Sequence, residues 1–198
     1  MNRPRLHLAS SSPRRHEILR TLGLDFSAAG VDLDESRREG ELADRLVVRL
    51  AREKARAVAG RQYAGPPVLA ADTLVVLDER IFGKPESENE AVEMLSALAA
   101  RPHRVLTAVA LLDAGTLRAT VSETTVRFRD ISPDEARAYW QTGEPQDKAG
   151  AYAIQGIGGL FVESIAGSFT GVVGLPVYET AALLQEAGIP ILGTTHET

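Results

Sequence analysis

The sequence predicts a mixed α/β fold, and two observations support this. Amphipathic helical patterns alternate with short apolar runs along the chain, as in proteins built from strands and helices. Two long strand patterns, 105–112 and 117–128, follow one another, and the residues between them favour a β-hairpin. A hairpin is antiparallel, so the sheet is not purely parallel. The 198 residues suit one domain over 1–198, with room for two small lobes at most.

The first half of the chain contains two predicted strands and two predicted helices. Residues 6–9 form a short apolar strand, and a serine-rich turn leads into a helix over 14–22. Apolar residues recur at helical spacing over 41–59, and 68–77 is almost continuously apolar, which favours a strand buried on both faces. The other side of the 41–59 helix is expected to be a solvated face, with Arg45, Arg49, Arg52 and Arg56.

Two helices in the second half begin with recognisable caps. Ser87 with Glu90, and Ser132 with Glu135, have the spacing of a capping box. Further strands are predicted over residues 151–154 and 159–165, and a last helix over residues 176–186.

Composition argues against several classes of protein. The chain is 44% hydrophobic and 25% charged, which is typical of globular proteins, and it has no cysteine for disulfides, thiolate catalysis or zinc ribbons. A formal net charge of −5 disfavours sequence-independent binding of nucleic acid. No apolar run approaches the roughly 20 residues of a membrane span. We therefore expect a cytoplasmic protein with neither nucleic acid nor membrane as a partner.

The serine-rich turn has the chemistry of an anion-binding site. Ser10 begins the run Ser-Ser-Ser-Pro-Arg-Arg, which combines hydroxyl donors, a helix N-terminus and the guanidinium groups of Arg14 and Arg15. Cations in an exposed first turn cost about 0.3–1 kcal/mol, and a bound polyanion would explain them. The alternative is a serine-capped surface helix with two solvated arginines.

Asp72 is an isolated acid within the apolar run 68–77. Burying an unpaired carboxylate costs several kcal/mol, so a metal ion, a lysine or a chain of water molecules must compensate. The alternative is a structural aspartate that bonds to local backbone amides. We favour a functional role, because the neighbours of Asp72 are so uniformly apolar.

Three further polar residues are candidates for ligand binding. Lys54 continues the inward stripe of Leu46 and Leu50, and either reaches the rim of a pocket or is only structural. Lys84 lies in a tight loop after the Asp72 strand, where a lysine is often only a solvated surface residue. Gln155 lies in a glycine-rich segment that allows close approach of a ligand, and its amide could read a base edge or tie down the loop.

The types of side chain in the sequence limit the reactions and the metal ions that the protein could use. The four histidines are scattered without metal-ligand spacing, so general-base catalysis falls to a carboxylate. Any metal would be a hard, oxygen-ligated ion such as Mg²⁺ or Mn²⁺. Carboxylates, lysines and arginines around a serine-rich turn suit hydrolysis of a phosphate ester by water.

Five motifs occur along the chain in this order: Leu-Ala-Ser-Ser-Ser-Pro-Arg-Arg at 8–15, Ala-Asp-Thr at 71–73, Gly-Lys-Pro at 83–85, Asp-Lys-Ala-Gly-Ala-Tyr at 147–152 and Val-Gly-Leu-Pro at 173–176. Together they resemble the Maf family, and the resemblance runs from about residue 6 to residue 184. It implies an elongated mixed α/β sheet flanked by helices, in two lobes with a central cleft, related to inosine triphosphatase. Its members are nucleoside triphosphate pyrophosphatases that need a divalent metal and are often dimers, so a homodimer is possible.

The resemblance also implies roles for single residues. Asp72 would accept the proton of the attacking water and, with Glu35, hold Mg²⁺ or Mn²⁺, although Asp32 and Asp34 compete with Glu35 for that position. Arg14, Thr73 and Gln155 resemble the trio of the branch that prefers dTTP and UTP. The triphosphate would be contacted by Ser10, Arg14, Arg15, Lys54 and Lys84.

The implied reaction is hydrolysis of dTTP and UTP to the nucleoside monophosphate and pyrophosphate, with modified pyrimidine nucleotides as further candidate substrates. Two alternatives stay open. One is a purine-directed pyrophosphatase for ITP or XTP. The other is a non-catalytic nucleotide-binding regulator of septum formation.

Overall fold

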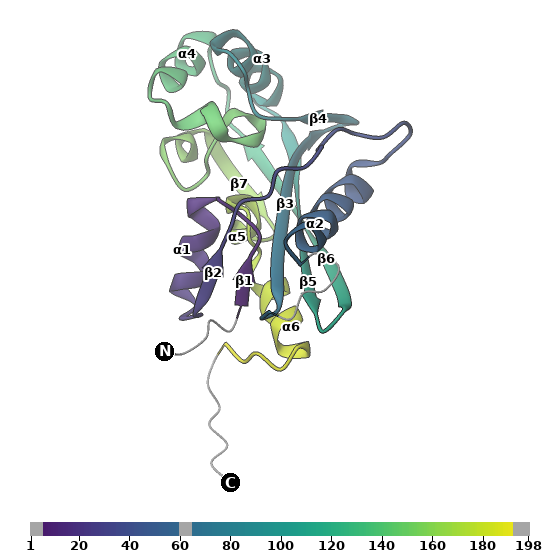
Figure 1. Cartoon of the computed structure of the whole chain (residues 1–198). Helices are drawn as coiled ribbons and strands as arrows, with labels where there is room; N and C mark the ends of the chain where they lie inside the picture. Colours follow the sequence, from purple (N-terminus) through teal and green to yellow (C-terminus); the bar gives the residue numbers. More distant parts are fainter. Residues whose placement is uncertain (1–5, 60–64, 192–198) are drawn as a thin grey trace. The chain divides into compact units, whose positions relative to one another are not determined.

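Seven strands form one sheet in the part of the chain that the structure describes, residues 6–59 and 65–191 of a computed structural model (Figure 1). The strand order is β2-β1-β3-β5-β6-β7, and β4 pairs with β3. The strands are β1 (Leu6–Leu8), β2 (Phe26–Ala28), β3 (Val68–Leu77), β4 (Arg80–Phe82), β5 (Pro102–Asp113), β6 (Thr116–Phe128) and β7 (Val162–Ala166).

The strand pairing confirms the predicted mixed sheet. β1 pairs in parallel with β2 and with β3, and Figure 1 shows these three strands side by side. β4 pairs antiparallel with β3, and β7 pairs antiparallel with β6. The predicted hairpin joins β5 to β6 through Ala114 and Gly115, whose φ angles of 45° and 82° are those of a type I′ turn.

The predicted helices are all present, with bounds that differ by one or two residues. Ser132 and Glu135 form the complete capping box at the start of α4. At α3 only half of the box forms: Ser87 accepts from the Glu90 backbone, but the Glu90 carboxylate bonds to the backbone of Glu86. The helices are α1 (Pro13–Thr21), α2 (Ala43–Ala59), α3 (Glu88–Leu98), α4 (Pro133–Gln141), α5 (Phe169–Val173) and α6 (Val177–Glu186).

The prediction of a strand over residues 151–154 is wrong. Gly150 and Ala151 have φ angles of 69° and 60°, which lie in the left-handed region and do not occur in a strand. Short 3₁₀ turns, Ala149–Ala151 and Ile157–Phe161, occupy this part of the chain, and the strand predicted from residue 159 begins only at Val162.

Contacts divide the chain into two compact units. The first unit comprises Met1–Asp72, Ala108–Val121 and Gly174–Thr198, and the second comprises Thr73–Thr107 and Ser122–Val173. Each unit has its own hydrophobic core, as expected for two lobes. The predicted cleft and the assignment of a single domain stay predictions.

Helices cover both faces of the sheet in the first unit. Leu69 of β3 packs in one core with Leu19 of α1 and Leu184 of α6. Side chains alternate along a strand, so Asp72 faces the opposite side. There it meets Lys54 of α2, which places α2 on that face. The flanked mixed α/β sheet is thereby confirmed.

In the second unit, α3 and α4 pack against the strands around an aromatic cluster. Phe128 lies edge to face with both His103 and Tyr152, at 4.7 Å between ring centroids in each case. His103 Nε2 and the Tyr152 hydroxyl are 2.9 Å apart. Over residues 6–59 and 65–191, no helix combines the length and the apolar character that crossing a membrane requires.

Candidate active site

Lys54 lies between two carboxylates in the first unit. Its Nζ is 2.5 Å from Oδ1 of Asp72 and 2.5 Å from Oε1 of Glu35. Asp72 is only 6% exposed and Lys54 only 8%. The inward position predicted for Lys54 is confirmed, and this lysine supplies the compensation that the buried carboxylate requires.

The surroundings of Asp72 act on its pKa in opposing directions. Burial raises the pKa of Asp72 above its ordinary value, and the negative charge of Glu35 adds to this rise. The positive charges of Lys54 and Arg15 oppose it. A carboxylate with a raised pKa is a stronger proton acceptor than an exposed one, so the position suits a general base.

A network of hydrogen bonds holds the serine-rich turn. Ser10 Oγ accepts from the Ser12 backbone N–H at 3.1 Å and from Arg15 Nη1 at 3.3 Å. Arg15 Nε donates to the Gly174 carbonyl oxygen at 2.7 Å, and His16 Nε2 donates to the Ser10 carbonyl oxygen at 2.8 Å. Within the described residues, the Ser12 side chain makes no capping bond, so the serine-capped surface helix is not what forms.

Arg15 connects this turn electrostatically with the carboxylates. Burial lowers the pKa of Arg15, and the nearby positive charge of Arg14 lowers it further. The negative charges of Asp72 and Glu35 act in the opposite direction. The charges of three other predicted site residues, Arg14, Glu35 and Asp72, are therefore close enough in the first unit to interact electrostatically with Arg15. Sequence reasoning did not find His16, because a lone histidine on a helix carries no distinctive pattern.

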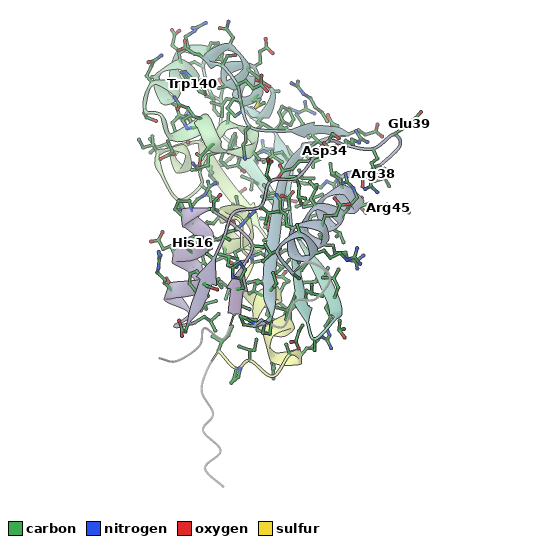
Figure 2. The ribbon with its side chains drawn as sticks, viewed as in Figure 1. His16, Asp34, Arg38, Glu39, Arg45 and Trp140 are labelled. Atoms are coloured by element: carbon green, nitrogen blue, oxygen red, sulfur yellow. The ribbon has the colours of Figure 1, made fainter. Side chains whose placement is uncertain are left out.

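Arg49 corrects the prediction of a fully solvated arginine face on α2. Its Nε donates to Glu41 Oε1 at 2.7 Å, and its Nη2 donates to the Ser36 carbonyl oxygen at 2.9 Å. It thereby ties α2 to the loop that carries Glu35. Arg45, labelled in Figure 2, is exposed as predicted, and so are Arg52 and Arg56.

The same loop distinguishes Glu35 from its acidic neighbour. Asp34 (Figure 2) accepts a hydrogen bond from the Ser36 backbone at 2.9 Å, and hydrogen bonding to Ser36 lowers the pKa of Asp34. Asp34 is therefore engaged within its own loop. Glu35 is the acid that contacts Lys54.

Asp72 and Glu35 offer oxygen ligands that suit a hard cation. Mg²⁺ is commonly held by one or two carboxylates together with phosphate oxygens of the substrate. Among the residues that the structure describes, no group of three or more histidine and acidic side chains is placed to hold a metal. An ion at these two carboxylates would share them with the Lys54 ammonium and would take its other ligands from phosphate and water.

Three of the predicted site residues belong to the second unit: Thr73, Lys84 and Gln155. Lys84 is exposed in the loop after β4, and the Gly83 carbonyl there accepts from the Gly150 N–H at 2.9 Å. Gln155 is exposed in the loop between two 3₁₀ turns.

Thr73 is part of a short hydroxyl chain. Its Oγ1 is 3.0 Å from Thr107 Oγ1, and Thr107 Oγ1 donates to the Gly171 carbonyl oxygen at 2.7 Å. Thr107 has a single hydroxyl proton, and that proton is used in the hydrogen bond to the Gly171 carbonyl. The Thr73 hydroxyl must therefore be the donor in the hydrogen bond to Thr107. Thr107 was not found by sequence reasoning, because a threonine in a strand is unremarkable.

Comparisons with known proteins point to one family. A family model described as Maf-like protein matches residues 5–187. The dTTP/UTP pyrophosphatase of Methylobacillus flagellatus is 48% identical over 195 residues, covering 98% of both chains. That of Chromobacterium violaceum is 50% identical over 194 residues, covering 96% of this chain and 98% of the relative. The Staphylococcus aureus Ham1 protein aligns with a TM-score of 0.42 at 15% identity, covering 65% of this chain and 72% of that chain.

Proposed function

The chain belongs to the Maf family, and from that premise we propose that it hydrolyses dTTP and UTP to the nucleoside monophosphate and pyrophosphate. The names of relatives about half identical over nearly the whole chain support this choice of substrate. The proposal includes a cytoplasmic location, because that is where its nucleotide substrates are made and used.

The observation that carries the proposal is the buried carboxylate of Asp72 beside Lys54. A protein that only bound a polyanion would gain nothing from a buried negative charge, whereas a hydrolase needs a proton acceptor. In the proposed step, the oxygen of a water molecule bonds to the α-phosphorus while Asp72 takes a proton from it. The bond from the α-phosphorus to the bridging oxygen breaks, pyrophosphate leaves, and the proton passes on to solvent.

The basic residues bind and orient the triphosphate in this proposal. Arg15 is already held by Ser10 and Gly174, so its guanidinium loses little freedom when it meets a phosphate. Arg14, Lys54 and Lys84 add positive charge. Asp72 and Glu35 would hold Mg²⁺ or Mn²⁺. When bound, this ion would supply positive charge that offsets the negative charge developing on the phosphate oxygens.

Recognition of the nucleobase is assigned to Thr73 and Gln155, together with Arg14. Because the Thr73 hydroxyl proton is directed to Thr107, the Thr73 oxygen would meet a bound nucleobase as an acceptor and not as a donor. Uracil and thymine carry a proton on N3, whereas the N3 of cytosine is itself an acceptor. This proton arrangement therefore supports selection of dTTP and UTP against CTP.

A panel of triphosphates, assayed with and without Mn²⁺ by chromatography of the products, tests the proposal. We expect metal-dependent release of pyrophosphate from dTTP and UTP. Strong turnover of ITP or XTP with weak turnover of dTTP and UTP would favour the purine alternative. Nucleotide binding without metal-dependent pyrophosphate release would favour the regulator.

A further inference from the structure

Donors from the loop that carries Gln155 surround the carboxylate of Glu144. Glu144 Oε2 accepts from the Ile157 N–H at 3.0 Å, and Oε1 accepts from the Gly158 N–H at 2.9 Å. The Tyr139 hydroxyl also donates to Oε1, at 2.6 Å. One side chain thus fixes the backbone directly after Gln155.

Tyr139 extends the same anchor to the other side of Gln155. Its hydroxyl accepts from the Ala153 N–H at 3.1 Å while it donates to Glu144. The backbone on both sides of Gln155 is therefore bonded to one carboxylate–phenol pair. The exposed Gln155 side chain lies between these anchor points in the sequence.

The glycines of this loop make room for the anchor. A Cβ added at Gly156 would collide with the Glu144 carboxylate, and the φ of Gly156 is −116°, which any residue can adopt. A Cβ at Gly158 would lie 2.5 Å from the Tyr139 hydroxyl. The sequence interpretation that these glycines admit a ligand is therefore incomplete, because Gly156 and Gly158 also admit Glu144 and Tyr139.

The protonation states of the pair match these bonds. Burial alone would raise the pKa of Glu144, but hydrogen bonds from Tyr139, Gly158 and Ile157 outweigh it and hold the pKa below its ordinary value. Burial and the bond to Glu144 raise the pKa of Tyr139, so the phenol keeps its proton. At neutral pH Glu144 is then only an acceptor, and its three partners are all donors.

We propose that Glu144 is a positioning residue for pyrimidine selectivity: it sets where Gln155 presents its amide, without touching the nucleotide itself. The inference rests on the proposed function and adds a residue to it. The observation that carries it is geometric. The contacts of Glu144 and Tyr139 anchor the Gln155 loop at Ala153, Ile157 and Gly158.

Glu144→Gln tests the proposal with an almost unchanged shape. One carboxylate oxygen becomes an NH₂ group that must face a donor, so the loop shifts. We expect the ratio of kcat/KM for UTP to that for CTP to fall about tenfold, which corresponds to the loss of one good contact in the transition state. Glu123→Gln is the matched control, because it makes the same change at an exposed ion pair with Arg104 and should keep the ratio.

Two further variants separate positioning from general stability. Tyr139→Phe removes the hydroxyl but keeps the ring, and should lower the same ratio. In a Gln155→Ala background, Glu144→Gln should change the ratio little further, because its effect passes through Gln155. Unfolding temperatures confirm that each variant is folded at the assay temperature.

The outcomes distinguish this inference from the proposed function. A folded Glu144→Gln protein with the wild-type ratio would overturn the inference, and so would an equal loss with and without Gln155. If Glu144→Gln does not fold, Tyr139→Phe decides by the same criterion. A wild-type protein that hydrolyses neither dTTP nor UTP would overturn the proposed function and this inference with it.

Discussion

Lys54 places its ammonium nitrogen 2.5 Å from a carboxylate oxygen of Asp72. The same nitrogen is 2.5 Å from an oxygen of Glu35, so a single buried cation serves two acids. This explains how a carboxylate is tolerated in an apolar strand. It also means that Lys54 controls the ionisation of the residue to which we assign the proton transfer.

Replacing Lys54 should move the pH dependence of the reaction. Asp72 must be ionised to accept a proton, so activity falls as the pH drops through its pKa. The positive charge of Lys54 lowers that pKa against the effect of burial. In Lys54→Met the pKa should be higher, and the acidic limb of kcat/KM should shift to higher pH.

A pH profile of kcat/KM measures this shift. Arg56→Met, an equal loss of charge on the exposed face of α2, is the control and should leave the limb in place. An unmoved acidic limb in folded Lys54→Met would show that Asp72 is not the group that titrates.

Arg15→Lys should weaken binding of the triphosphate. Lysine cannot keep both the bond to the Gly174 carbonyl and the bond to Ser10 in the same planar arrangement. We expect KM to rise about tenfold or more, a loss on the order of 1.4 kcal/mol. Steady-state kinetics on dTTP check this, with Arg20→Lys on the exposed side of α1 as control. Equal KM values in both variants would argue against phosphate binding by Arg15.

Thr107→Val should relax discrimination against CTP. Without the Thr107 oxygen, the Thr73 hydroxyl can rotate and donate to the N3 of cytosine. The variant also leaves the Gly171 carbonyl without its donor, at a cost of about 1–3 kcal/mol in stability. Thr107→Ser keeps the hydroxyl and should restore the UTP to CTP ratio of kcat/KM. A valine variant that is folded and as selective as the wild type would contradict the proposed proton arrangement.

Acid should destabilise the protein in part through His103. Burial lowers the pKa of His103 from 6.5 to about 4, so the folded state favours the neutral ring. The unfolded state then binds more protons, and stability is lost as the pH falls from 6.5 towards 4. The loss is on the order of 2–3 kcal/mol. Urea unfolding at pH 7 and pH 4.5 measures it, and the difference should shrink in His103→Gln. An equal difference in the variant would assign the acid sensitivity to other groups.

The parts of the fold with a strong local pattern could be predicted from the sequence. The continuous apolar run predicted the bounds of β3, Val68–Leu77, correctly. The four-residue spacing from Leu46 likewise predicted that Lys54 points inward. Local sequence patterns do not predict the structure where a residue adopts an unusual backbone conformation. Nothing in the residue types shows that Ala151 adopts a φ of 60°, and the strand predicted there does not form.

The supporting residues of the candidate site could not be predicted, because their partners are distant or ordinary in sequence. Arg49 has the spacing of a solvated face, but its partners lie in the loop that carries Glu35. Glu144 and Tyr139 acquire their roles only when the chain returns at residues 153–158. β2 and β4 have three residues each, which is too short for a periodic signal.

Hydrolysis of dTTP in ¹⁸O-labelled water by the wild type and by Asp72→Asn, with Mg²⁺ or Mn²⁺ present, is the most direct test of the proposed attack and of the role assigned to Asp72. Attack on the α-phosphorus predicts label in dTMP and none in pyrophosphate. Folded Asp72→Asn should lose about 10²- to 10⁴-fold in turnover, the usual contribution of a general base. Label in pyrophosphate, or near-normal turnover by the folded asparagine variant, would contradict the proposal.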